Sequence, residues 1–241
     1  MKKILYSIAI LAASALTFAS CEKGQFIEEN TSTTGATVIS ASIESSLTKA
    51  ALSGNDAQGY EVLWSKGDRI RVIGQDGFDK YYTLVGDGGS TKGTFTGDPM
   101  PDGDYRAFYS ISGTQLPDKQ LFNEGKTDNS PMYAEFKVSD GKADEASFWN
   151  LCGLLRINIG RSDGKKVRSI EVSADQYMAG LITIYGDKHI TITEGTWPLP
   201  PSKSVTLDCG EQGVAVSPNS ADFCIALPAN DYTGVKMVIS Y

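Results

Sequence analysis

Short segments in which apolar and polar residues alternate dominate the chain from about residue 36 onward. Between residues 38 and 46, Ile39, Ala41 and Ile43 are separated by polar residues, and this spacing of two predicts a half-buried β-strand. No segment after residue 21 sustains the helical spacing of apolar residues. Further strands are predicted at residues 60–64, 69–73, 80–85, 93–96, 104–110, 132–138, 168–173, 180–185, 189–193, 204–207, 213–216, 223–227 and 235–241.

Asp-Gly pairs mark many of the turns between these segments, because both residues tolerate the positive φ that tight hairpin turns require. The pairs are Asp76-Gly77, Asp87-Gly88, Asp102-Gly103, Asp140-Gly141 and Asp163-Gly164. Strands without helices, joined by tight turns, predict an all-β protein of two tandem antiparallel β-sandwiches with Greek-key connections. We place the N-terminal sandwich at residues 36–145 and the C-terminal sandwich at residues 146–241.

Two further segments stand out from this pattern. Residues 147–159 form the most apolar segment of the mature chain and predict one central strand, with Leu151, Leu155, Ile157 and Ile159 largely on one face. Residues 113–131 lack apolar periodicity and contain two prolines, so we expect them to form the longest surface loop.

The first twenty residues have the organisation of a secretory signal rather than of a fold element. Lys2 and Lys3 precede an uncharged apolar run at residues 4–15, which is too short to span a bilayer comfortably. Small residues then stand before Cys21, so the segment resembles a bacterial lipoprotein signal, although Phe18 departs from the usual aliphatic residue. The resemblance implies cleavage between Ser20 and Cys21 and lipidation of Cys21. The alternative is an ordinary secreted protein that is cut nearby.

The remaining composition narrows the classes of partner. The polar residues 21–35 are expected to form a flexible tether. Formal net charge is -7 and becomes -9 without Lys2 and Lys3, which argues against binding to nucleic acid. The basic group at residues 165–168 follows a predicted turn and is better explained as a solvated hairpin end.

Cysteine and histidine usage gives little support for metal chemistry. After Cys21 only Cys152, Cys209 and Cys224 remain, an odd number that allows at most one disulfide. Cys209 and Cys224 are the candidate pair in an oxidising compartment, and the alternative is three small apolar side chains in strands. With a single histidine, His189, and no Cys-x-x-Cys spacing, we expect no metal site and no cofactor.

Candidate catalytic and ligand-binding groups are also sparse. Asp98, Asp102 and Asp104 lie close together in the sequence, but they lack the spacing of a helix-loop-helix calcium site and are better explained as turn-forming acids. No nucleophile-base pair or carboxylate motif is recognisable, so we do not expect an enzyme. Five aromatic residues are candidates for stacking on sugar rings, although aromatics in sandwiches more often lie in the core. These are Tyr81, Tyr82, Tyr105, Trp149 and Trp197.

A set of short motifs in order resembles the fimbrillin-like lipoproteins of Bacteroidetes, which are subunits of the type V pilus and their relatives. Each motif alone has low specificity, whereas the ordered set covers nearly all of the mature chain. The motifs are Thr48-Lys49-Ala50, residues 64–72 (WSKGDRIRV), 93–97 (GTFTG), 104–109 (DYRAFY), 148–157 (FWNLCGLLRI), 169–172 (SIEV) with Gly180, and 226–229 (ALPA).

The resemblance implies two transthyretin-like sandwiches and display at the outer membrane, with assembly by donor-strand exchange. In that scheme a trypsin-like protease removes an N-terminal strand, and a strand from a neighbouring subunit fills the vacated groove. The matching strand here is residues 38–46, with Val38, Ile39, Ala41 and Ile43. Lys49 is the first basic residue after it and is the candidate cleavage site.

The chain departs from the family pattern at its C-terminal strand, residues 235–241, because polymerising members usually carry further sequence there. An incomplete second sandwich would expose an edge, so either the sequence is shorter than its fold or a partner's strand completes it. A shaft, anchor or tip subunit with other fimbrial subunits as partners is expected. The alternative is a surface glycan-binding lipoprotein, which requires a row of exposed aromatic side chains rather than a releasable strand above an apolar groove.

Overall fold

The computed structural model describes residues 35–44, 53–55, 59–111, 113–123, 131–194, 200–216 and 219–241. The described residues form strands, turns and irregular segments without a helix, so the expectation of an all-β protein is confirmed. Residues 34–241 form one compact unit.

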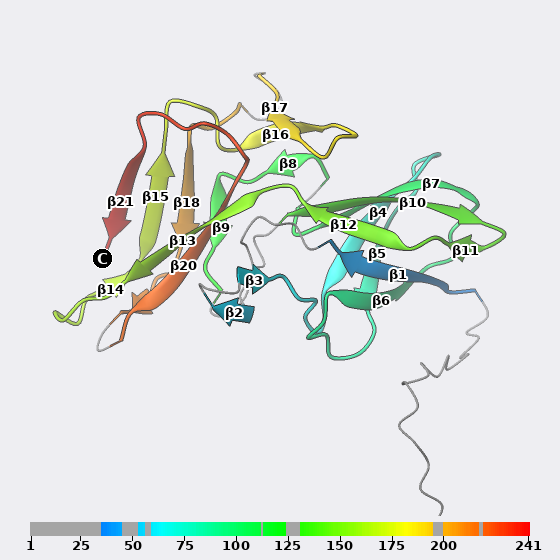
Figure 1. Ribbon diagram of the computed structural model, residues 1–241, viewed down its shortest axis with the longest axis horizontal. Helices are drawn as coiled ribbons and strands as arrows, with labels where there is room; N and C mark the ends of the chain where they lie inside the picture. Colours follow the sequence, from blue (N-terminus) through cyan, green and yellow to red (C-terminus); the bar gives the residue numbers. More distant parts are fainter. Residues whose placement is uncertain are drawn as a thin grey trace, which may run out of the picture. The chain divides into compact units, whose positions relative to one another are not determined.

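Seven strands of the first half close into a ring, rather than forming two separate sheets (Figure 1). Their order is β10-β12-β1-β6-β5-β4-β7, and β7 pairs again with β10. A short strand, β11, is attached to β10. The bounds are β1 Thr37–Ile43, β4 Arg69–Ile73, β5 Asp79–Leu84, β6 Lys92–Gly97, β7 Gly103–Tyr109, β10 Met132–Ser139, β11 Lys142–Ala143 and β12 Ala146–Asn150.

The turn chemistry expected from the Asp-Gly pairs is present in full at two of the five pairs, whereas at Asp87-Gly88, Asp102-Gly103 and Asp163-Gly164 only the glycine has a positive φ. Asp140 and Gly141 have φ of 53° and 71°, and they join β10 to β11 with Ser139 opposite Lys142. Asp76 and Gly77 also have positive φ, between β4 and β5. These turns direct the antiparallel neighbours of the ring back along one another.

Aromatic side chains fill the interior of this barrel. The fully buried Trp64 is contacted edge-on by the rings of Phe95, Tyr109 and Phe148, with centroids 4.9 to 5.3 Å apart. Alternating inward residues of each strand supply the rest of the core, as the spacing of two in the sequence predicts.

The second half contains several smaller sheets around its own apolar core. β15 lies between β18 and β21, β13 pairs with β20, and β16 pairs with β17. The bounds are β13 Gly153–Ile159, β14 Lys166–Val167, β15 Ser169–Ser173, β16 Gly180–Ile184, β17 Ile190–Ile192, β18 Ser204–Asp208, β19 Val214–Ala215, β20 Ala221–Leu227 and β21 Lys236–Ser240. A separate two-stranded sheet consists of β2 Ser53–Asn55 and β3 Gly59–Glu61.

Two expectations about individual segments are wrong. Residues 147–159 do not form one strand, because β12 belongs to the barrel whereas β13, after a break at residues 151 and 152, pairs with β20. Residues 113–123 are not a plain surface loop. They supply β8 Gln115–Leu116, which pairs with β16, and β9 Lys119–Leu121, which pairs in parallel with β18.

Candidate functional site

The candidate site is β1 together with its two neighbouring strands, one on each side. β1 pairs antiparallel with β6, where Ile39 lies opposite Phe95, and parallel with β12, where Ala41 lies opposite Ala146. Figure 1 shows β1 in blue beside β6 and β12. The predicted alternation is present, because Ile39, Ala41 and Ile43 are buried whereas Val38 is 55% exposed.

Polar contacts fix both ends of β1. At its start, the Met100 N–H donates to the Thr37 hydroxyl oxygen at 2.9 Å. At its end, the Ile43 N–H donates to the carbonyl of Thr91 at 2.8 Å, and the Glu44 N–H donates to the carbonyl of Phe148 at 2.7 Å. The carboxylate of Glu44 also accepts a hydrogen bond from the Ser147 hydroxyl at 3.1 Å and pairs with Lys188.

The residues that pack against the buried side of β1, here called the floor, are apolar, and their side chains alternate in size along the strand. Ala41 lies between Gly93 of β6 and Ala146 of β12, all three small. The indole of Trp64 closes this point, because a Cβ added at Gly93 would lie 2.9 Å from the Cδ1 atom of Trp64. Next to it, Ile39 pairs with Phe95 and Ile43 with Phe148, so the strand fits large, small and large side chains in turn.

The aromatic residues considered for sugar stacking lie mostly in the core. Tyr82 is fully buried and its hydroxyl donates to the carbonyl of Asp98, and its burial raises the pKa of the phenol. Tyr105 and Trp149 are buried as well. Tyr81 is half exposed, and the guanidinium of Arg69 lies 4.5 Å from its ring centroid. The described residues therefore present no row of exposed aromatics at these positions.

The three aspartates at residues 98–104 act in separate places. Asp102 accepts hydrogen bonds from the N–H groups of Asp140 and Gly141, both at 3.0 Å, and these bonds lower the pKa of its carboxyl. Asp98 pairs with Lys80 at 3.2 Å, and Asp104 lies on β7 opposite Lys137. Among the described residues, no group of three or more acidic, cysteine or histidine side chains could hold a metal ion.

The single histidine lies in the turn between β16 and β17 and is exposed to solvent. Its Nδ1 atom contacts the carboxylate of Asp187, and its ring stacks on Tyr185 with centroids 4.2 Å apart. The hydrogen bond with His189 lowers the pKa of the Asp187 carboxyl. No described nucleophile is held within hydrogen-bond reach of the ring.

The candidate disulfide between Cys209 and Cys224 is absent, because Cys152, Cys209 and Cys224 are all free thiols. Burial raises the pKa of Cys152 to about 12 and that of Cys209 to about 11, so both thiols stay protonated near neutral pH. Cys152 is buried between β12 and β13, whereas Cys209 and Cys224 are half-buried. All three behave as small, weakly polar packing residues.

Several predicted site residues lie outside the described part of the chain. These are Ser20 and Cys21 at the signal cleavage site, Lys49 at the candidate protease site, and Trp197. The tether expected at residues 21–35 lies outside it too, except for Gly35.

One buried polar contact in the second half has no recognisable signal in the sequence. Gln120 of β9 is 4% exposed, and its side-chain amide clamps the backbone of Ala226 in β20. Its Nε2 donates to the Ala226 carbonyl at 2.8 Å, and its Oε1 accepts from the Ala226 N–H at 2.9 Å. A glutamine between two prolines in a segment without periodicity has the sequence context of an ordinary loop residue, so the local pattern does not predict this contact.

The described part of the chain offers no helical segment that could span a membrane. Comparison with protein-family models, with curated proteins and with solved structures found no match to this chain.

Proposed function

We propose that this protein is a fimbrial subunit of the type V pilus kind, serving as shaft, anchor or tip, that is assembled by β-strand exchange and contributes to adhesion. The observation that carries the proposal is the position of β1, an amphipathic strand near the start of the described chain that closes the ring between β6 and β12. Removing it would leave two strand edges unpaired over an apolar floor.

The groove left by β1 has the two properties that strand exchange needs. The backbone groups of β6 and β12 offer hydrogen bonds to any strand of suitable length, and so they give affinity without sequence preference. The succession of large, small and large side chains at Ile39, Ala41 and Ile43 supplies selectivity. A donor strand from a neighbouring subunit would therefore need a small residue at its centre.

Lipid on Cys21 would hold the subunit at the outer membrane before assembly, with residues 21–35 as the tether. Cleavage after Lys49 would release the lipid and β1 together, because β1 ends at Ile43. The partners are other fimbrial subunits, the membrane through the lipid, and a surface ligand of the host or of other bacteria, and nucleic acid is not among them.

The proposed role is structural rather than catalytic. The proposal also assigns both halves to transthyretin-like sandwiches. In the first half, hydrogen bonds between β7 and β10 would join the two edges that remain open in an ordinary sandwich. Burial of Tyr82, Tyr105 and Trp149 argues against the alternative role of a glycan-binding lipoprotein.

The proposal is tested by electron microscopy of surface material with an antibody to this chain, with and without trypsin treatment. Labelled filaments, together with a new N-terminus after Lys49 on the filamentous protein, are the expected result. Absence of labelled filaments under every condition, with only lipidated Cys21 as N-terminus, would contradict the proposal.

Changing Cys21→Ser tests the anchor separately. We expect loss of the protein from the outer-membrane fraction and from the cell surface, because the acceptor of the lipid is gone. The matched control is Cys209→Ser, which leaves the N-terminal signal intact. Unchanged fractionation of Cys21→Ser would remove the lipid anchor from the proposal.

A further inference from the structure

The strand β21 lies at the outer edge of its sheet, with β15 on one side (Figure 1, red). The direction of its backbone groups follows from two hydrogen bonds. The N–H of Ala174 donates to the carbonyl of Lys203, so the even-numbered residues within β15 direct their backbone groups toward β18. The N–H of Arg168, just before β15, donates to the carbonyl of Ser240, so Ser240 directs its backbone groups toward β15. Because backbone groups alternate sides along a strand, Met237 and Ile239 direct theirs away from β15.

This edge is also unusually apolar. Val235, Met237, Val238 and Tyr241 are 56%, 44%, 57% and 40% exposed. Met237 lies opposite Val172 on the core face of the sheet, whereas Val238 lies opposite Glu171 on the outer face. Both faces of the strand therefore keep apolar side chains in contact with solvent, which is a combination that edge strands usually avoid.

We propose that β21 pairs with β21 of a second copy of this chain, antiparallel and around a twofold axis at Val238. In this register Met237 faces Ile239 of the other copy, Val235 faces Tyr241, and Val238 faces its own counterpart. The outward backbone groups of Met237 and Ile239 then form the hydrogen-bonded pairs, and Val238 occupies a non-hydrogen-bonded pair. The two four-stranded sheets would become one continuous sheet.

A second copy suits this edge because the strand can pair with itself so that apolar residues face apolar residues and no like charges meet. Residues 235–241 contain no acidic side chain and one basic side chain, Lys236, in a chain with 29 acidic and 22 basic residues. The proposed register places Lys236 beside Ser240 of the other copy and so avoids a like-charge pair. A shift that centred the axis on Lys236 would bring the two ammonium groups face to face, which disfavours that register.

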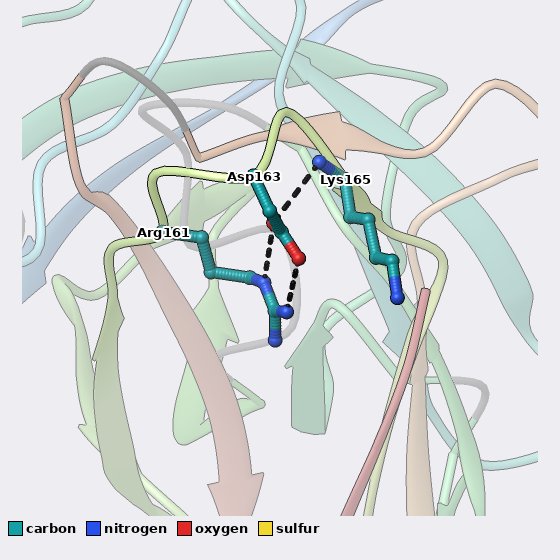
Figure 2. A network of polar contacts seen from close by, with 3 residues as sticks. All are labelled: Arg161, Asp163 and Lys165. Carbon is teal, nitrogen blue, oxygen red and sulfur yellow. Dashed lines mark hydrogen bonds and ion pairs between the residues drawn. The ribbon is translucent and has the colours of Figure 1, made fainter.

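The end of the strand is held in position by the loop that follows β13. Figure 2 shows Asp163 accepting hydrogen bonds from the guanidinium of Arg161, with Nε at 2.8 Å, and from the backbone N–H of Lys165 at 3.3 Å. The same guanidinium lies 4.2 Å from the ring centroid of Tyr241. This contact orients Tyr241 before association and so reduces the entropy that pairing would cost.

A five-residue strand buries less area than the roughly 1,600 Å² of a standard stable interface, so the dimer is expected to be weak and dependent on concentration. The inference does not rest on the proposed fimbrial role, because it concerns the second half of the chain and needs no removal of β1.

The test is disulfide trapping with the chain from Glu22 onward, which keeps the whole compact unit of residues 34–241. In Val238→Cys the two introduced thiols face each other across the axis, at a Cα separation of about 4.5 Å that a disulfide can span. We expect a covalent dimer under mild oxidation. The matched control is Val235→Cys, equally exposed, whose two copies would lie roughly 20 Å apart and should not form a bond.

Sedimentation velocity over a concentration series gives the second readout. The parent chain should approach twice the monomer mass as its concentration rises, whereas Val238→Lys should stay monomeric because two cations would meet at the axis. Val85→Lys, at a position of the barrel with the same exposure, should dimerise like the parent. Equal trapping of both cysteine variants, species larger than a dimer, or a parent chain that stays monomeric would each overturn the proposal.

Discussion

At the scale of single residues, the amide of Gln120 is a buried polar group that joins β9 to β20 in the second half. Changing Gln120→Leu keeps the size of the side chain but leaves the buried N–H and carbonyl of Ala226 without partners. Since each buried group left unsatisfied costs about 1–3 kcal/mol, we expect the free energy of unfolding to fall by at least about 2 kcal/mol. Urea denaturation measures this difference.

Gln176 offers a control because its amide also makes two hydrogen bonds to one residue, but at an exposed place. Its Oε1 accepts from the N–H of Thr233 at 2.8 Å, and its Nε2 donates to the Thr233 hydroxyl oxygen at 2.9 Å. Water can replace both bonds, so Gln176→Leu should change stability by less than about 0.5 kcal/mol. Equal effects of the two variants would show that burial does not decide the strength of the Gln120 clamp.

Asp102 gives the fold a dependence on pH, because its carboxylate joins two turns of the barrel. Hydrogen bonds from Gly141 and Asp140 lower its pKa below the usual 3.8 in the folded protein. A lowered folded pKa means that the stabilisation is fully present above the unfolded pKa and is lost as the pH falls through the folded value. We therefore expect the wild type to melt higher than Asp102→Asn near neutral pH, and this gap should close below about pH 4.

Thermal melts at a series of pH values check this expectation. The control is Asp104→Asn, an exposed carboxylate two positions on that lies on β7 and does not bridge two turns. A gap between wild type and Asp102→Asn that stays constant down to pH 2 would assign the effect to shape rather than to charge.

Residue patterns predicted burial well where one face of a strand is apolar and failed where a residue type suits either face. The alternation of Ile39, Ala41 and Ile43 correctly indicated their burial, because polar neighbours left only one way to orient the strand. For Tyr81 and Tyr82 the sequence offers two adjacent aromatics that must face opposite sides. Which of them enters the core depends on pairing with β4, which no local pattern reveals.

At the scale of elements, the small residue at the centre of β1 is its most constrained position. Ala41→Leu would add three heavy atoms to a side chain that already lies against Gly93, Ala146 and the indole of Trp64. Overpacking of this kind costs about 1–3 kcal/mol, so the free energy of unfolding should fall by that amount. Val38→Leu, on the exposed face of the same strand, serves as the control and should change stability by less than about 0.5 kcal/mol.

The outcome also bears on strand exchange. If β1 is the strand that a donor replaces, Ala41→Leu should promote opening of the ring and speed proteolysis near Lys49, whereas Val38→Leu should not. Unaltered stability of Ala41→Leu would show that the floor beneath β1 adapts to larger side chains and would weaken the argument for selectivity.

The existence of most strands was predictable, but their partners were not, and the parallel pairings of β1 with β12 and of β9 with β18 depart from the antiparallel arrangement expected. The apolar run at residues 147–159 indicated strand structure correctly, yet it gave no sign that β12 and β13 separate into different sheets. β8 and β9 are so short that the spacing of apolar residues cannot reveal them. Closure of the ring between β7 and β10 is likewise a long-range pairing that the periodicity of each strand does not contain.

At the scale of the whole molecule, the second half depends on strands that come from earlier in the chain. β8 and β9 precede β10 in sequence, yet they pair with β16 and β18. We expect residues 152–241 produced alone to remain largely unfolded, because they lack both strands and the clamp of Gln120. Adding residues 34–151 as a separate chain should restore structure.

Near-ultraviolet circular dichroism and the dispersion of amide proton signals measure the difference between the single and combined fragments. A control mixture uses residues 34–151 with Gln120→Leu, which should restore structure less completely. Folding of residues 152–241 by themselves would show that β8 and β9 add little to that half.

The position of β1 has a further consequence for how the protein is made. Its two neighbours are synthesised at very different times, since Glu44 at its end and its hydrogen-bond partner Ser147 lie 103 positions apart. A chain that emerges from its N-terminus can pair β1 with β6 early, but the other edge of β1 waits until β12 arrives. Such distant pairings are slow, and an unfilled edge invites foreign strands in the meantime. A chain that folds from its N-terminus therefore passes through an interval in which a chaperone that covers this edge would raise the yield of folded protein.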